Sequence, residues 1–426
     1  WVQQGIYTEP NDQSLWLYHH WLTALGRDCS QSRITHCASF GGALYVFFSE
    51  AVCACDGMIS ACGDSGGSLQ GTFVPSAPDP AAVGRRTRPL SAKRSRWLHG
   101  WKFIPDGGLP ADFLPEEVAV QACVKEVGSH ADGRPARGRR RLEFSGPLLI
   151  CDGTESKSPS PALSSLLGVK HTQERADILR GELVRVEELL EIEPECKWAL
   201  LARGRLANAL AAGATAQEAE SAQRTLIESY GRIAELDPAR QGFYMEARAE
   251  SELRLRIMAW LQAGDGVGFE TPLDLCGLNL RQVPSAVVCH TFGVRRLNAS
   301  RVGLTSLGPL LQLCTLEELD LAGNSIGGDI REVFCLPRLR RLDVSNNRLG
   351  LYYTAGIAPA APPTLCDVTA SGNSPILDAL RADSDQQAFI ARVMSTAGSL
   401  QGPQGWTLEA CMGEGRCIFR RDSAPA

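Results

Sequence analysis

Residues 316–326 read LEELDLAGNSI, and this stretch decides how the second half of the chain folds. It follows the pattern L-x-x-L-x-L-x-x-N-x-I through Leu316, Leu319, Leu321, Asn324 and Ile326. A second copy, LRRLDVSNNRL at 339–349, places equivalent residues at Leu339, Leu342, Val344 and Asn347. Weaker copies start at Glu270, Val294 and Leu365, and the last has Asn373 in the asparagine position.

Successive copies start 22 to 26 residues apart, within the ~20–29 residues typical of leucine-rich repeats. Each such unit lays down one short parallel strand, and stacked units bury their leucines in one continuous core. We therefore predict a leucine-rich repeat α/β solenoid over residues 270–380, with the asparagines bonded to backbone groups in the bends.

The outward-facing strand residues are charged in a regular way. Stacking the strands ~4.8 Å apart predicts two columns of alternating charge, Arg295–Glu317–Arg340 and Arg296–Glu318–Arg341. Such neighbours support one another by a few tenths to ~1 kcal/mol. We interpret this face as solvated and internally paired, although a ligand surface is the alternative.

Composition divides the remaining sequence into three parts. Residues 1–28 are aromatic and helical in pattern, and 160–262 show apolar residues at helical spacing. The acidic segments EIEP (191–194) and ELDP (235–238) each end in a proline, which stops one helix and can open the next. The region 160–262 is therefore expected to form antiparallel helical hairpins.

Residues 29–150 have no helical periodicity and are predicted to form a small β-domain with long loops. Its expected strands are 43–48, 118–124 and 142–150. Two basic runs, 85–96 and 134–141, are interpreted as solvated loops because the chain as a whole is acidic.

Bulk properties set limits on function. The chain has 426 residues, 44% of them hydrophobic, and a formal net charge of −5. This balance does not favour nucleic acid as a partner, and no apolar run approaches the ~18–20 residues that span a bilayer. The 15 cysteines are odd in number and scattered, which is typical of a reduced, intracellular protein.

Three motifs suggest chemistry that we do not predict. Residues 63–67 read GDSGG, the run around the nucleophilic serine of trypsin-like proteases, but His36 and Ser65 are only 29 residues apart instead of ~140. Cys53, Cys55 and Cys62 have no second pair at zinc-finger spacing. The glycine cluster at 264–268 follows a helix and not a strand, so it is interpreted as a linker and not as a nucleotide-binding loop.

Residues 10–22, PNDQSLWLYHHWL, could be simply an aromatic helical core, but they also resemble the repeat of protein prenyltransferase α-subunits, P-x-N-x-x-x-W-x-x-R-x-x-L. In this register Asp12 stands in the asparagine position and His19 replaces the arginine. His19-His20 is interpreted as surface or interface and not as a metal site. The candidate repeat-motif or partner-interface residues are Pro10, Asp12, Trp16, Tyr18, His19 and Trp21.

The order of modules resembles the long form of Rab geranylgeranyltransferase α-subunits. That resemblance implies a last prenyltransferase repeat at 1–28, an Ig-like β-sandwich insertion at 29–150, helical hairpins at 160–262 and leucine-rich repeats at 270–380. The C-terminal extension 381–426 has no counterpart in it.

The same resemblance implies a function. These enzymes transfer geranylgeranyl groups from geranylgeranyl diphosphate to C-terminal cysteines of Rab GTPases presented by Rab escort protein. The catalytic zinc is expected on the partner β-subunit. No catalytic residue, metal or cofactor is expected in this chain. The resemblance places any active-site contribution upstream of Trp1, so this cytoplasmic chain alone is expected to be inactive.

The competing hypothesis is a non-enzymatic leucine-rich repeat scaffold for protein–protein interaction. The sequence before Trp1 would separate the two, because further prenyltransferase repeats there favour the transferase subunit and an unrelated domain favours the scaffold.

Overall fold

The computed structural model divides the chain into two compact units. One comprises 1–31, 159–263 and 278–280, and the other comprises the remaining residues. The residues that the structure describes are 2–24, 34–40, 42–62, 68–75, 98–109, 117–129, 135–150, 173–211, 214–263, 271–284, 289–291, 293–329, 333, 336–350, 364–369, 371–373, 406–411 and 416–421.

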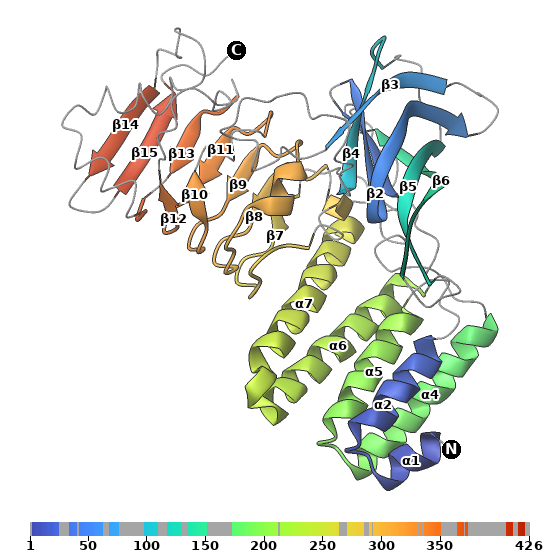
Figure 1. Cartoon of the computed structure of the whole chain (residues 1–426). Helices are drawn as coiled ribbons and strands as arrows, with labels where there is room; N and C mark the ends of the chain where they lie inside the picture. Colours follow the sequence, from blue (N-terminus) through green and yellow to red (C-terminus); the bar gives the residue numbers. More distant parts are fainter. Residues whose placement is uncertain are drawn as a thin grey trace. The chain divides into compact units, whose positions relative to one another are not determined.

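The first unit is helical (Figure 1). Its described helices are α1 (Val2–Thr8), α2 (Gln13–Ala24), α4 (Gln173–Ile192), α5 (Lys197–Leu210), α6 (Ala216–Leu236), the 3₁₀ turn η1 (Pro238–Arg240) and α7 (Gln241–Ala263). Consecutive helices from α4 to α7 lie side by side and are joined by short connections, so the predicted helical hairpins are confirmed.

Proline and capping residues fix where these helices end. Helix α4 stops at Ile192, two residues before Pro194, and α6 stops at Leu236, two residues before Pro238. Thr215 begins α6 with a capping box, in which its side chain and that of Glu218 each bond the other's backbone N–H.

One buried cluster joins helices that are far apart in sequence. Ile6 of α1 and Trp16 of α2 pack with Leu179, Val186 and Leu189 of α4, and with residues at the start of α5 and within it. Burying each of these large side chains contributes roughly 1.5–3 kcal/mol. The helical array therefore continues from α2 to α4 across the strands that the sequence places between them.

The intervening region forms a mostly antiparallel sheet. Its strands are β1 (Ile34–Phe40), β2 (Ala43–Cys62), β3 (Ser68–Pro75), β4 (Leu98–Pro105), β5 (Glu117–Ser129) and β6 (Pro135–Ile150). They are hydrogen-bonded in the order β1-β6-β5-β2-β3-β4, with further pairs β1–β2 and β2–β4, and only β1–β6 is parallel. Because β2 pairs with β1 and β4 through its first half and with β5 through its second, the sheet curves back on itself.

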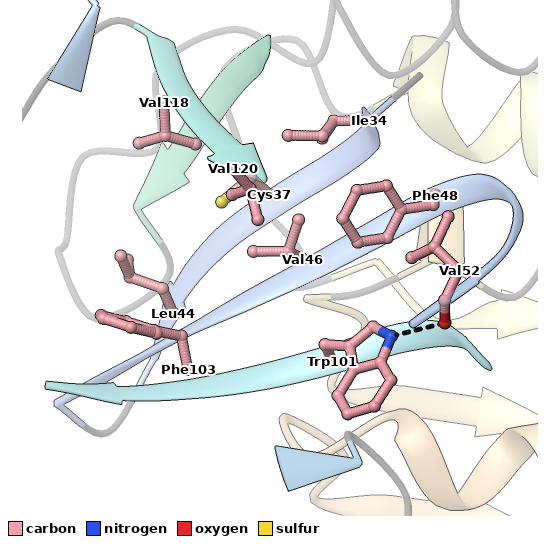
Figure 2. Close-up of a cluster of buried hydrophobic side chains, with 10 residues drawn as sticks. All are labelled: Ile34, Cys37, Leu44, Val46, Phe48, Val52, Trp101, Phe103, Val118 and Val120. Atoms are coloured by element: carbon pink, nitrogen blue, oxygen red, sulfur yellow. Dashed lines mark hydrogen bonds between the residues drawn. The ribbon is translucent and has the colours of Figure 1, made fainter. Parts of the chain in front are cut away.

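Figure 2 shows the core of this region. Alternate residues of β2, Leu44, Val46 and Phe48, are almost fully buried against neighbours from β1, β4 and β5. Trp101 closes the cluster, and its indole N–H donates to the carbonyl of Val52 at 3.2 Å. At Gly71 a Cβ atom would lie only 2.2 Å from the carbonyl oxygen of Ile104, so this position of β3 requires glycine.

The interpretation of the run 134–141 as a loop is wrong for residues 135–141. These residues belong to β6, which pairs with β5 continuously from Glu117 opposite Pro147 to Ser129 opposite Pro135. Extension of the ladder satisfies the backbone groups of the basic segment, a long-range pairing that local composition did not indicate. The other basic run, 85–96, lies outside the described residues.

The leucine-rich region forms the predicted parallel sheet. Its strands are β7 (Leu273–Asp274), β8 (Arg296–Asn298), β9 (Glu318–Asp320), β11 (Arg341–Asp343) and β13 (Asp367–Thr369). A second ladder pairs β10 (Gly327–Asp329) with β12 (Arg348–Gly350), and 3₁₀ turns lie at Cys289–Thr291 (η3) and Gly308–Gln312 (η4).

The C-terminal extension adds two strands to this sheet. Strand β15 (Arg416–Arg421) pairs antiparallel with β13, and β14 (Trp406–Cys411) pairs with β15 (Figure 1). The family resemblance had given residues 381–426 no counterpart, and no strand was predicted there.

Candidate functional site

Trp16 anchors α2 to the rest of the helical array. Its side chain is 5% exposed, and its indole N–H donates to the carbonyl of Pro10 at 2.7 Å. The Cys196 thiol, at the start of α5, donates to the same carbonyl at 3.2 Å. The turn before α2 is thereby tied to two helices at once, which fixes the orientation of the indole.

Asp12 begins α2. Its Oδ1 atom accepts a hydrogen bond from the Ser14 N–H at 2.8 Å, which satisfies one of the donors left open at a helix start. The predicted helix start after Pro10 is therefore confirmed. In the asparagine position of the prenyltransferase pattern, Asp12 performs a local capping role.

His19 is inside the helical array and not on the surface, which was one of the two alternatives, surface or interface, given for it. It is 6% exposed, and its Nε2 lies 3.0 Å from Oε2 of Glu182 on α4. The other oxygen of Glu182 accepts from Arg185. The His19 ring also meets Trp16 edge-on, with the ring centroids 5.7 Å apart.

Sequence reasoning missed the acidic partner of His19. Glu182 is separated from His19 by 163 positions and lies in an amphipathic helix whose acidic residues all look equivalent in sequence. Where the family pattern has an arginine, this chain thus has an imidazole in contact with a carboxylate.

Tyr18 and Asp12 are the candidate residues with described side chains that the structure places on the outside. For Tyr18 the exposure is large. Its side chain is 48% exposed, whereas Pro10, Trp16 and His19 serve contacts within the helical unit. The side chain of Trp21 lies outside the described part of the chain. The six candidates therefore do not form one described surface.

The repeat asparagines hold successive coils of the solenoid together. Oδ1 of Asn324 accepts from the N–H groups of Val302, Gly303 and Leu304 at 2.8–3.0 Å. Its amide donates to the carbonyls of Ala299 and Leu321, both at 2.8 Å. Asn324 thus satisfies backbone groups in the bend of the preceding repeat, as the sequence predicted.

The other repeat-motif residues take equivalent positions. Asn347 accepts from the Ile326 N–H and donates to the Leu321 and Val344 carbonyls, and Asn373 donates to the Val344 carbonyl. The apolar motif residues are at most 2% exposed: Leu316, Leu319, Leu321, Leu339, Leu342 and Val344.

The strand face carries the predicted charge columns. Arg296, Glu318 and Arg341 occupy one register position on β8, β9 and β11. Arg341 lies 3.2 Å from Glu318 and 3.8 Å from Asp367, and Arg295 lies 3.9 Å from Glu317. Each of these partly exposed ion pairs contributes little to stability. The same strand residues line a shallow groove that carries charges of both signs.

One carboxyl on this face has a perturbed pKa. Burial raises the pKa of Asp320, and the neighbouring carboxylate of Asp343 raises it further. The hydrogen bond that Asp320 accepts from the Ala322 N–H lowers this pKa and so opposes the shift. The Asp320 side chain stabilises the turn that follows its own strand, and nothing in this geometry indicates acid–base catalysis.

Comparison with known proteins found matches both to the leucine-rich repeats and to the chain as a whole. A family model described as Leucine Rich Repeat matches residues 315–336. Geranylgeranyl transferase type-2 subunit alpha of Rattus norvegicus is 26% identical over 380 residues, covering 88% of this chain and 58% of the relative. The Homo sapiens protein of the same name is 27% identical over 356 residues, covering 82% of this chain and 54% of the relative.

This chain is homologous to geranylgeranyl transferase type-2 alpha subunits. It spans a little more than half of the length of these relatives.

Several motifs of this alpha-subunit homologue cannot be placed. Ser65, the glycine cluster 264–268 and the side chains of His36, Cys53, Cys55 and Cys62 lie outside the described residues. Within the described side chains, no group of three or more His, Cys, Asp or Glu is arranged to hold a metal ion. None of the helices described has both the length and the apolar character needed to cross a bilayer.

Proposed function

We propose that this chain is the α-subunit of a Rab geranylgeranyltransferase. In this role it supports a β-subunit that transfers geranylgeranyl groups from geranylgeranyl diphosphate to C-terminal cysteines of Rab GTPases presented by Rab escort protein. The proposal extends the homology from a family relationship to a specific activity and specific partners.

The observation that carries the proposal is the shared core of α2 and α4. Trp16 and Leu179 pack in one cluster although six strands separate their helices in sequence. An array of helical hairpins interrupted by a β-domain and followed by leucine-rich repeats is the module order expected of the long α-subunits. We assign the β-region, residues 29–150, to an Ig-like sandwich insertion, with hairpins at 160–262 and repeats at 270–380.

In this proposal the chain is a docking subunit of a cytoplasmic heterodimer and holds no catalytic group. Thiol alkylation requires a thiolate, and a zinc ion supplies one by lowering the pKa of the thiol it binds. We place that zinc on the β-subunit. Tyr18, exposed on α2, is a described candidate for contact with the partner.

The test is reconstitution of the protein in its full-length form with the β-subunit from the same source. Co-purification as a zinc-containing heterodimer, and transfer of labelled geranylgeranyl to Rab in the presence of escort protein, are the expected results. Tyr18→Arg should weaken the heterodimer, whereas Phe243→Arg, at a more exposed aromatic position on α7, should not.

A protein that stays monomeric and never stimulates lipid transfer to Rab contradicts the proposal. Capture of other proteins through the leucine-rich face would then favour the non-enzymatic scaffold.

A further inference from the structure

A cavity of about 110 Å³ lies between α2, α4 and α5 and has no role in the function proposed above. Helix α2 contributes Trp16, His20 and Thr23 to its wall, α4 contributes Arg175, and α5 contributes Trp198 and Arg205. All of these helices belong to one compact unit. The cavity is therefore a feature of the helical array itself.

The charge of the wall is one-sided. Two guanidinium groups, those of Arg175 and Arg205, line the cavity, and among its described lining residues none is acidic. The nearby carboxylate of Glu182 is engaged by His19 and Arg185 and is not part of the lining. Within the described chain no carboxylate lies within ion-pair distance of Arg205, whose side chain is exposed.

The rest of the wall is aromatic and aliphatic. The indoles of Trp16 and Trp198 and the side chains of Leu179 and Leu206 present apolar surface to the cavity. A cavity of ~150 Å³ with an apolar lining holds benzene, so the enclosed part here accommodates a short chain or part of one ring. Larger groups would extend toward the solvent.

Two side chains of the wall are held in place by hydrogen bonds within the chain. The Trp16 indole N–H donates to the Pro10 carbonyl at 2.7 Å, and the His19 imidazole, which also lines the cavity, lies 3.0 Å from the Glu182 carboxylate. Sites whose side chains are already held in place lose less entropy on binding.

From this arrangement we propose that the cavity is a binding site for a carboxylate attached to a small apolar or single-ring body. Guanidinium groups match the planar geometry of a carboxylate and bind it through two parallel hydrogen bonds. Indole faces and leucine side chains receive the apolar body. Two sources have this chemistry, a free aromatic acid and the C-terminus of a polypeptide that ends in an apolar residue.

The test is calorimetric titration of the full 426-residue chain with benzoate. Benzoate should bind saturably with one site per chain and more weakly at high salt, and its neutral counterpart benzamide should bind at least about tenfold more weakly. A short peptide ending in phenylalanine, compared with its C-terminal amide, distinguishes the two sources. If the peptide with a free C-terminal carboxylate binds more tightly than its amide, the ligand is a polypeptide terminus. If benzoate binds and the peptide does not, the ligand is a small acid.

Substitution tests the assigned residues. Arg205→Gln should weaken benzoate binding about tenfold or more without changing the melting temperature, because the Arg205 side chain is exposed. Arg205→Lys should restore part of the affinity. Arg224→Gln, an exposed arginine on α6 that pairs with Glu220 outside the cavity, is the matched control and should bind as the parent does.

Three results would overturn the proposal. These are absence of saturable benzoate binding, equal affinity for benzoate and benzamide, and an Arg205→Gln variant that folds and binds benzoate like the parent.

Discussion

At the scale of single residues, Asn324 contributes more to the solenoid than its size suggests. Its side chain makes five hydrogen bonds to backbone groups, three as acceptor and two as donor, and is 7% exposed. Without it, the buried N–H groups of Val302 and Leu304, and the more exposed N–H of Gly303, would lose this acceptor. A buried donor left unsatisfied costs about 1–3 kcal/mol.

We therefore predict that Asn324→Ala lowers the free energy of unfolding of the leucine-rich region by about 2–4 kcal/mol. Hydrogen exchange of the amides in β8 and β9 measures this local stability. Ser325→Ala, at the exposed neighbouring position, should change it by less than about 0.5 kcal/mol. Equal exchange rates in the two variants would contradict the role assigned to Asn324.

The cysteines of the solenoid differ in reactivity because their surroundings differ. Hydrogen bonds from Ser300 and Arg301 lower the pKa of the half-buried Cys276, with the Arg301 guanidinium 3.6 Å from Sγ. Burial raises the pKa of the Cys314 thiol to about 11. None of the five cysteines whose side chains are described is in a disulfide.

The thiolate is the reactive form, so we expect iodoacetamide to modify Cys276 first and Cys314 last among the described thiols. Because the pKa of Cys276 is lowered, its rate should level off at a lower pH than that of an ordinary thiol. Ser300→Ala should raise that pKa and slow the reaction at neutral pH. Peptide mapping by mass spectrometry over a pH series gives the rates, and a Cys276 profile that matches an unperturbed thiol would exclude this effect.

At the scale of elements, the start of α6 is held by a reciprocal cap. The Glu218 carboxylate accepts from the Thr215 N–H at 2.8 Å and from its hydroxyl at 2.9 Å, while the Glu218 N–H donates to that hydroxyl at 3.3 Å. These hydrogen bonds from Thr215 lower the pKa of Glu218. The stabilisation is therefore present above the pKa of the unfolded chain and is lost as pH falls through the lower folded-state value.

Thr215→Ala should thus lower the stability of the helical unit by about 1 kcal/mol at neutral pH. The difference from the parent should shrink below the ordinary glutamate value of 4.5, because protonated Glu218 no longer gains from the cap. Urea unfolding followed by far-UV circular dichroism measures the stability difference at neutral pH and at a pH below 4.5. Ser221→Ala, at an exposed position of α6, is the control. A difference that is the same at both pH values would show that Glu218 takes no part.

Local patterns predicted some elements well and others poorly. Pro194 and Pro238 marked helix ends because proline acts on its own neighbours, and the asparagines marked repeat bends because their partners lie one repeat away. The extended pairing of β6 with β5 and the Cys196–Pro10 contact were not predictable, since each depends on residues brought together only by the fold. The burial of His19 depends on Glu182 in the same way.

At the scale of the whole molecule, the sequence predicted a leucine-rich parallel sheet but not how that sheet ends. A parallel sheet that ended at β13 would present the unpaired backbone groups of an edge strand. Solenoids usually end in a capping element for this reason. Here β15 covers that edge through pairs of residues 367–369 with 418–420, and β14 becomes the outer strand.

Removal of residues 401–426 should therefore destabilise the last repeat. We expect backbone amides of β13 to exchange at least about tenfold faster, which corresponds to ~1.4 kcal/mol of lost local stability, and we expect the truncated protein to self-associate as its concentration rises. Hydrogen exchange and sedimentation velocity measure these effects. Deletion of 422–426 alone leaves both strands in place and serves as the control, and exchange of β13 that is unchanged in the longer truncation would show that the hairpin does not cap the solenoid.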